Sequence, residues 1–139
     1  MIELDPLSIY DRGLDDLSLL HGYERLVFML QDFDNLMEME GWEHFFLYES
    51  HFAWYGEMKQ WLQAIGDEAS LAVLSDFERH LAARGVELAP TALEASFETQ
   101  PKHDSREEPD WCDRYSALRE ERWAQAVDYL QSQGVRIHL

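Results

Sequence analysis

Apolar side chains recur at three- and four-residue steps along most of this chain, the spacing that places them on one face of an α-helix. The first long segment with this pattern spans residues 18–40, with Ser18 as its expected N-cap and Gly41 at its end. A short helix at 42–49 is expected to follow at a different angle. The buried face of the first helix is predicted to consist of Leu19, Tyr23, Leu26, Leu30, Phe33 and Met37.

The rest of the chain shows the same helical periodicity, and no stretch alternates for long enough to predict a β-strand. Gly66 and Gly85 mark helix ends, and Asp67 is an expected N-cap. A charged, proline-containing stretch at 100–110 predicts an exposed loop. The pattern predicts an all-α fold, a single compact domain over residues 1–139 with about five or six helices. The later helices are expected at 55–65, from 67 to about 84, from 90 onward and at 110–133.

The composition is that of a folded domain, because 46% of the residues are hydrophobic and 13% are aromatic. The single cysteine, Cys112, cannot form a disulfide within the chain, which fits a reducing compartment. The first residues are acidic where a secretory signal would be basic. No apolar run approaches the ~20 residues that cross a bilayer. We therefore expect a cytoplasmic protein that does not enter a membrane.

Negative charge is concentrated in the first 58 residues, which contain thirteen acidic side chains and two basic ones, Arg12 and Arg25. This half therefore carries 11 of the 17 net negative charges, and no lysine or arginine occurs at 26–58. A field of this sign repels nucleic acid and anionic lipid and attracts basic protein surfaces. We expect an acidic N-terminal half, 1–58, and a mixed-charge C-terminal half. The expected partner is a basic protein, either a DNA-binding protein or a toxin, and not nucleic acid itself.

Clustered carboxylates in this half are the candidate partner-binding groups. Spread evenly, 28 carboxylates would place only about three in a standard ~800 Å² footprint, too few to imitate DNA phosphates. Clustered carboxylates could instead accept hydrogen bonds from arginine and lysine in place of phosphate oxygens. A solvated acidic face without a partner is the alternative interpretation. The candidate residues are Glu24, Asp32, Asp34, Glu38, Glu40, Glu43 and Glu49.

Aromatic side chains form the second concentrated feature, since eight of the 18 lie between 42 and 61. Large aromatic side chains usually form the packing centre of a small helical domain, which is the favoured interpretation. They could also line a pocket, so a small-ligand binder or enzyme that uses this cluster is a further alternative. The eight residues are Trp42, Phe45, Phe46, Tyr48, Phe52, Trp54, Tyr55 and Trp61.

No catalytic or metal-binding motif accompanies these features. The chain lacks a Gly-x-Ser-x-Gly elbow, a dinucleotide fingerprint and a His-Glu-x-x-His pair. Glu40, His44 and His51 would share one side only of an unbroken helix, which Gly41 interrupts. We therefore predict a non-enzymatic protein without a metal or another cofactor. The basic cluster of the last helix lies beside acidic residues and predicts a salt-bridged surface; it comprises Arg114, Arg119 and Arg122.

Several short segments match the pattern of a known family: Leu17-Ser18, Glu24-Arg25, Glu38-Met39-Glu40-Gly41-Trp42-Glu43-His44-Phe45-Phe46, Ala64-Ile65-Gly66-Asp67 and the closing helix from Trp111 to Leu130. In these segments the chain resembles a bacterial all-α domain family of otherwise unknown function, which includes a mimic of double-stranded DNA. The resemblance implies an all-α fold, and it implies DNA mimicry as far as the acidity of this chain supports it.

The chain also departs from the family pattern at polar positions. Met39-Glu40 replaces an Asn-Gly pair, His44 replaces a glutamine and Tyr48 replaces an asparagine. Any site that those polar residues form in relatives is therefore altered here. The leading hypothesis is a non-enzymatic DNA mimic that occupies the basic surface of a DNA-binding protein. The alternative is an immunity protein that neutralises a basic toxin such as a nuclease.

Overall fold

The computed structural model describes residues 2–39, 49–89 and 111–138. The predicted all-α fold is confirmed, since six α-helices and one 3-10 helix make up most of the described residues. A pair of three-residue strands is added to them. The elements are β1 (Ile2–Leu4), α1 (Pro6–Asp15), η1 (Leu17–Leu19), α2 (Tyr23–Met39), α4 (Glu49–Ala64), α5 (Glu68–Ala83), α7 (Trp111–Ser116), α8 (Arg119–Ser132) and β2 (Val135–Ile137).

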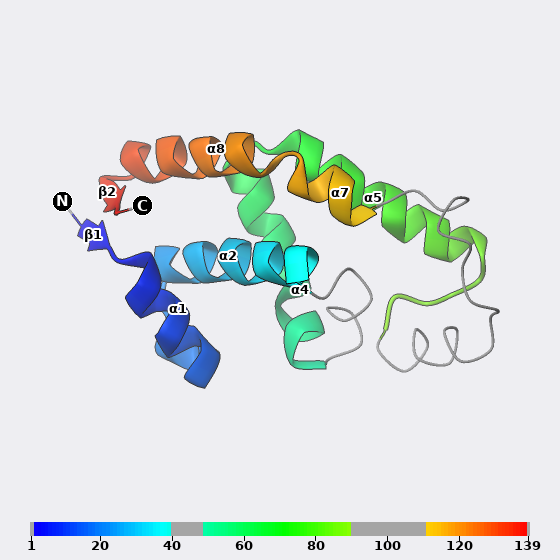
Figure 1. Ribbon diagram of the computed structural model, residues 1–139, viewed down its shortest axis with the longest axis horizontal. Helices are drawn as coiled ribbons and strands as arrows, with labels where there is room; N and C mark the ends of the chain where they lie inside the picture. Colours follow the sequence, from blue (N-terminus) through cyan, green and yellow to red (C-terminus); the bar gives the residue numbers. More distant parts are fainter. Residues whose placement is uncertain (1, 40–48, 90–110, 139) are drawn as a thin grey trace.

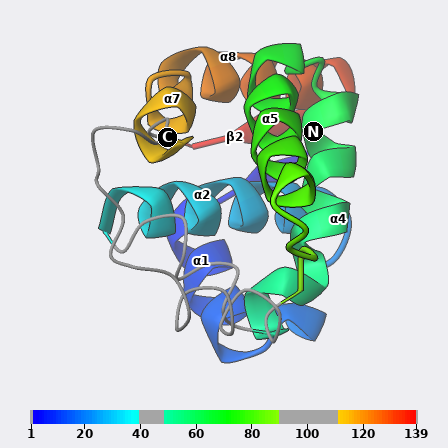
Figure 2. The ribbon, with the colours of Figure 1, turned by 90° about the vertical axis from the view of Figure 1, so that its right-hand side faces the viewer.

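Helix α2 is the centre of the fold. In Figures 1 and 2, α1 lies on one side of α2 and the α7–α8 pair lies on the other, while α4 and α5 pack beside them. The five successive residues from Leu26 to Leu30 are all buried. A helix that is buried around its whole circumference is covered by other elements on every side. Polar side chains on such a helix must therefore find partners inside the protein.

The predicted start of this central helix is wrong by five residues. Ser18 lies in the 3-10 helix η1, and α2 begins at Tyr23. Gly22 separates the two elements with a φ of +56°, a left-handed conformation that glycine adopts without steric cost. The predicted start of α5 is confirmed, because the side chain of Asp67 caps that helix by accepting a hydrogen bond from Ser70 N at 3.0 Å.

The predicted last helix is divided into α7 and α8. At the junction, Leu118 N donates to Tyr115 O at 3.1 Å, a tighter turn than that of an α-helix. The same carbonyl also accepts a hydrogen bond from Arg122 Nη1 at 3.1 Å. A buried guanidinium therefore occupies the backbone acceptor at the point where the helix is interrupted.

Strands β1 and β2 pair in parallel and bring the two ends of the described chain together, with Ile2 opposite Val135. Leu4 and Val135 are buried and close one end of the core. Three residues are too few for a recognisable alternation, so the sequence pattern did not predict this sheet. None of the helices in the described ranges has the length and hydropathy needed to cross a membrane.

Candidate functional site

Four of the seven carboxylates predicted to bind a partner have described side chains, and all four lie on α2. Glu40 and Glu43 lie outside the described residues, and Glu49 begins α4 without a described side chain. The four on α2 have different environments, because two are buried and two are at least partly exposed. They are Glu24, Asp32, Asp34 and Glu38.

Asp34 is a structural residue, with only 3% of its surface exposed. Its two oxygens accept hydrogen bonds from Arg122 Nη2 at 2.7 Å and from Trp123 Nε1 at 2.8 Å. Arg122 is fully buried, donates to Ser70 Oγ at 2.9 Å and lies 3.7 Å from the centroid of the Tyr115 ring. This network joins α2, α5, α7 and α8. The expectation that Asp34 faces a partner is therefore corrected, as is the surface position expected for Arg122.

The two outer carboxylates of α2 are held by arginines from other elements. Glu24 accepts a hydrogen bond from Arg12 Nη2 of α1 at 2.6 Å. Glu38 forms an ion pair with Arg119 of α8. Each arginine compensates one negative charge, so these carboxylates add little net charge to the surface. The arginines lie 12 and 81 residues away along the chain, which explains why the local sequence pattern did not indicate these pairs.

Uncompensated acidic side chains instead lie on α1 or cap α1 and η1. In the described part of the chain, no lysine, arginine or histidine forms an ion pair with the carboxylates of this segment. Hydrogen bonds from the hydroxyl and amide of Ser18 lower the pKa of one of them, Asp16, which keeps it ionised. All are exposed, and they are Asp5, Asp11, Asp15 and Asp16.

The outer face of α1 combines charge with apolar surface. Asp11 and Asp15 are one helical turn apart, which places both on this face. Leu7 and Leu14 flank them and are 75% and 58% exposed. A partner that docks on this face would contact both the acids and these aliphatic side chains. We call these four residues the α1 face.

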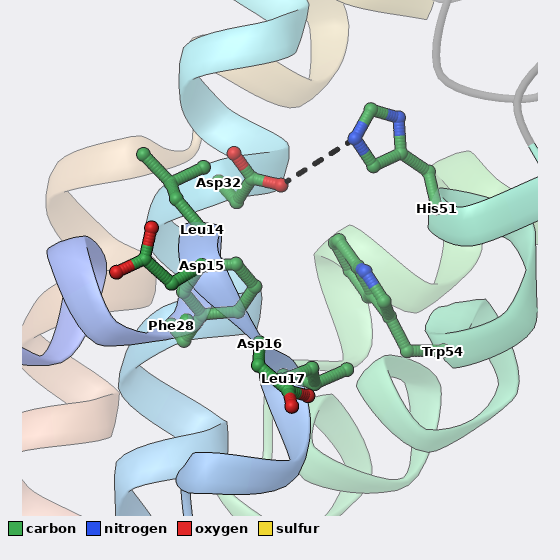
Figure 3. A pocket seen from close by; sticks show the side chains of 9 residues that line it. Leu14, Asp15, Asp16, Leu17, Phe28, Asp32, His51 and Trp54 are labelled. Carbon is green, nitrogen blue, oxygen red and sulfur yellow. Dashed lines mark ion pairs between the residues drawn. The ribbon is translucent and has the colours of Figure 1, made fainter.

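A pocket of about 250 Å³ lies beside the α1 face, where α1 and η1 meet α2 and α4 (Figure 3). Asp32 of α2 forms part of its wall and is 4% exposed. Asp15 and Asp16 line it from the α1 side, so the pocket is continuous with the α1 face. We call it the Asp32 pocket; its lining residues are Gly13, Leu14, Asp15, Asp16, Leu17, Phe28, Asp32, His51 and Trp54.

Among the described residues, no lysine or arginine lies beside Asp32, in contrast to Asp34. Its Oδ1 accepts a hydrogen bond from the Tyr10 hydroxyl at 3.2 Å. Its Oδ2 lies 3.9 Å from His51 Nε2, and that imidazole is positive only when protonated (Figure 3). Burial raises the pKa of Asp32, and the nearby His51 and Tyr10 only partly oppose this effect.

Gly13 determines how closely α1 approaches the pocket. A Cβ atom at this position would lie 2.3 Å from Cδ2 of Phe28 and 2.9 Å from Cδ1 of Leu20. Only glycine therefore allows α1 to pack against α2 at this distance. The close packing brings Asp15 and Asp16 to the pocket that Asp32 lines on α2.

The aromatic cluster at 42–61 is described only from Phe52 onward. Trp54 and Tyr55 are buried in the core, and Phe52 and Trp61 are half-buried against it. Trp54 also lines the Asp32 pocket and meets the Phe28 ring edge-on, with centroids 6.2 Å apart. The described ranges contain no group of three His, Cys, Asp or Glu side chains arranged to hold a metal.

The sequence pattern missed α1 and therefore the acidic residues that it positions. Asp5 caps α1, and Pro6 occupies its first turn, a pair that marks a helix start. That signal was present in the sequence. The acids of this segment contributed to the count of negative charge but not to the predicted site.

A family model described as DMP19-like protein matches residues 18–133. The match confirms the resemblance to an all-α family that includes a DNA mimic. It begins within η1 and extends through α8, so α1 precedes the matched segment. Searches of curated proteins and of solved structures gave no significant match.

Proposed function

The chain belongs to the DMP19-like protein family, and on that premise we propose that it acts as a DNA mimic that occupies the basic surface of a DNA-binding protein. The net charge of −17 supports this proposal, because it favours encounter with a basic surface. The observation that carries it is the exposed, uncompensated acidity of α1 and η1. In this role the carboxylates accept the hydrogen bonds that arginine and lysine otherwise donate to phosphates.

The charge density of this segment suits the proposal. Helix α1 is about 15 Å long, because each of its ten residues adds ~1.5 Å. A duplex of the same length carries about nine phosphates, of which roughly half face one side. Two carboxylates, Asp11 and Asp15, share one face of α1, and Asp5 and Asp16 cap its two ends, so the segment carries four carboxylates against the roughly four or five phosphates on one face of that duplex. The average acidity of the whole surface does not reach this density.

Affinity capture from a cell lysate, followed by competition with double-stranded DNA, tests the proposal. We expect the chain to recover a DNA-binding protein, duplex DNA to displace it, and binding to weaken with added salt. Recovery of a partner that binds DNA and the chain at the same time would refute the mimic. Recovery of a toxin that the chain neutralises without competition from DNA would favour the immunity hypothesis instead.

A matched pair of variants separates the α1 face from net charge alone. Asp11→Asn/Asp15→Asn removes two charges from the α1 face, and Glu120→Gln/Glu121→Gln removes two exposed charges from α8. We expect the first to weaken partner binding about tenfold, since each exposed charged contact contributes roughly 0.5–1 kcal/mol. The second should change binding less than twofold. Equal weakening by both would leave only a non-specific effect of charge.

A further inference from the structure

We infer that the Asp32 pocket receives one arginine side chain of the basic partner. The inference rests on the proposed function and deepens it, because it identifies which group of the partner enters the protein surface and where. The probe that tests it is a small guanidinium compound, so the pocket can be examined without the partner.

The first support is a buried carboxylate that has no permanent cation among the described residues. Asp32 and Asp34 lie two positions apart on α2 and are equally buried. Asp34 is neutralised by Arg122, whereas no arginine or lysine of the described residues pairs with Asp32. The cation nearest to Asp32 among the described residues is His51, 3.9 Å from Oδ2, which is positive only when protonated. A buried ionised carboxylate without a permanent counterion is costly, so a guanidinium from outside would compensate this charge.

The second support is the position of the acceptor oxygens. Asp32 Oδ1 already accepts the Tyr10 hydroxyl, and Oδ2 accepts no hydrogen bond from any described residue. Asp15 and Asp16 line the same pocket from α1 and are exposed. A cation that enters would therefore pass exposed carboxylates before it reaches the buried one. Charges of one sign around a pocket with apolar walls strengthen the local field.

The third support is an arrangement that the chain itself already contains. Arg122 lies over the ring of Tyr115 while it donates to Asp34. The lining residues of the Asp32 pocket include a carboxylate and the aromatic rings of Phe28 and Trp54, but no arginine (Figure 3). The pocket therefore shares two components of the Arg122 site, a buried carboxylate and aromatic rings.

The geometry favours arginine over lysine. A guanidinium is planar, stacks on aromatic rings, donates from a fork and is more weakly hydrated than an ammonium. Its aliphatic stem would pack against Leu14 and Leu17 at the pocket wall. A volume of about 250 Å³ also leaves room for water beside the guanidinium.

Titration of the ¹⁵N-labelled full chain with Nα-acetyl-arginine amide, followed by NMR, tests this inference. The matched control is Nα-acetyl-citrulline amide, which has nearly the same shape without the charge. We expect shifts of the Trp54 indole and of amides around Asp32, with a Kd of about 1 mM, typical of one small cationic group. Citrulline amide should bind at least fivefold more weakly.

Variants localise the effect. Asp32→Asn should weaken binding of the arginine probe about tenfold, and Asp15→Asn on the exposed rim should weaken it two- to threefold. Glu120→Gln on α8 should leave binding unchanged. Equal binding of the two amides, shifts centred elsewhere, or unchanged binding in both pocket variants would overturn the inference. If Asp32→Asn alters the fold, Asp15→Asn on the rim still tests the inference.

The two proposals fail in different ways. If the arginine probe does not bind but duplex DNA still displaces the captured partner, the pocket inference is wrong and the proposed function stands. If the probe binds but no DNA-binding protein is captured, the proposed function is wrong, and the partner assigned to the pocket falls with it.

Discussion

Replacement of Arg122 by methionine tests whether the Asp34 network stabilises the fold. This network consists of Asp34, Arg122, Trp123, Ser70 and Tyr115. The substitution preserves much of the side-chain length but leaves the Asp34 carboxylate buried without its principal cation. Asp34 would keep the hydrogen bond from Trp123 at 2.8 Å and would remain 3.8 Å from the exposed Arg119. Loss of one partner of a buried ion pair costs about 3–5 kcal/mol, and these remaining contacts favour the lower end of that range.

We therefore expect Arg122→Met to lower the free energy of unfolding by about 3 kcal/mol and the Tm by roughly 10 °C. Urea denaturation at pH 7, followed by far-UV circular dichroism, measures the change. The control is Arg119→Met, which removes a half-exposed guanidinium and should cost less than about 1 kcal/mol. The double variant Asp34→Leu/Arg122→Met should recover most of the loss, because an apolar pair leaves no buried charge.

The pH dependence gives an independent check. Once Arg122 is removed, burial holds the pKa of Asp34 above its value in the unfolded chain. In the variant, protonated Asp34 then contributes its full stabilisation at low pH, and this contribution is lost as the pH rises through the folded-state pKa of Asp34. The deficit of Arg122→Met should accordingly shrink on acidification. The loss of stability in Arg122→Met could instead be independent of pH and persist in the double variant. That result would show that the loss comes from missing packing contacts and not from an unpaired charge.

Three further substitutions test individual parts of the site. Gly13→Ala should destabilise the protein by about 1–3 kcal/mol in urea denaturation, because the new Cβ would collide with Phe28. In the control, Gly56→Ala in α4, the new Cβ meets no atom within 4 Å, so the change should be neutral or stabilising. Asp32→Asn should raise the Tm near neutral pH, because burial raises the pKa of Asp32 and disfavours its ionised form in the folded state. This gain in Tm should vanish on acidification, and a gain that grows at low pH would contradict the prediction. Asp67→Ala should cost about 1 kcal/mol through loss of the α5 cap, and an unchanged free energy of unfolding would contradict the capping role.

Helices and their buried faces could be predicted because they depend on local spacing. Leu26, Leu30, Phe33 and Met37 recur at helical steps, and all four are buried in the structure. The prediction of Leu19 on the same face is wrong, because Leu19 lies in η1 and is 49% exposed. The capping role of Asp67 is equally local and was also predicted. These features require only residues within one or two turns of each other.

The environment of each carboxylate could not be predicted in the same way. Asp34 and Arg122 are 88 residues apart, and no local pattern connects them. Asp32 and Asp34 have the same side chain and neighbouring positions, but α8 supplies an arginine to one and the pocket leaves the other without one. The sequence therefore indicated how much negative charge is present, and tertiary contacts determine where it is accessible.

The distribution of arginines explains why the accessible charge lies on the side of α2 that α1 covers (Figure 1). Three of its four described carboxylates are compensated by arginines from α1 and α8. Among the described residues, no arginine pairs with Asp32, which has only His51 at 3.9 Å, and no cation pairs with Asp15 or Asp16. Both of these carboxylates line the Asp32 pocket, and Asp15 also belongs to the α1 face. On the proposed function, a basic surface that docks on α1 would therefore place a cation beside the pocket. Partner recognition and occupation of the pocket should therefore weaken together when Asp15 is neutralised.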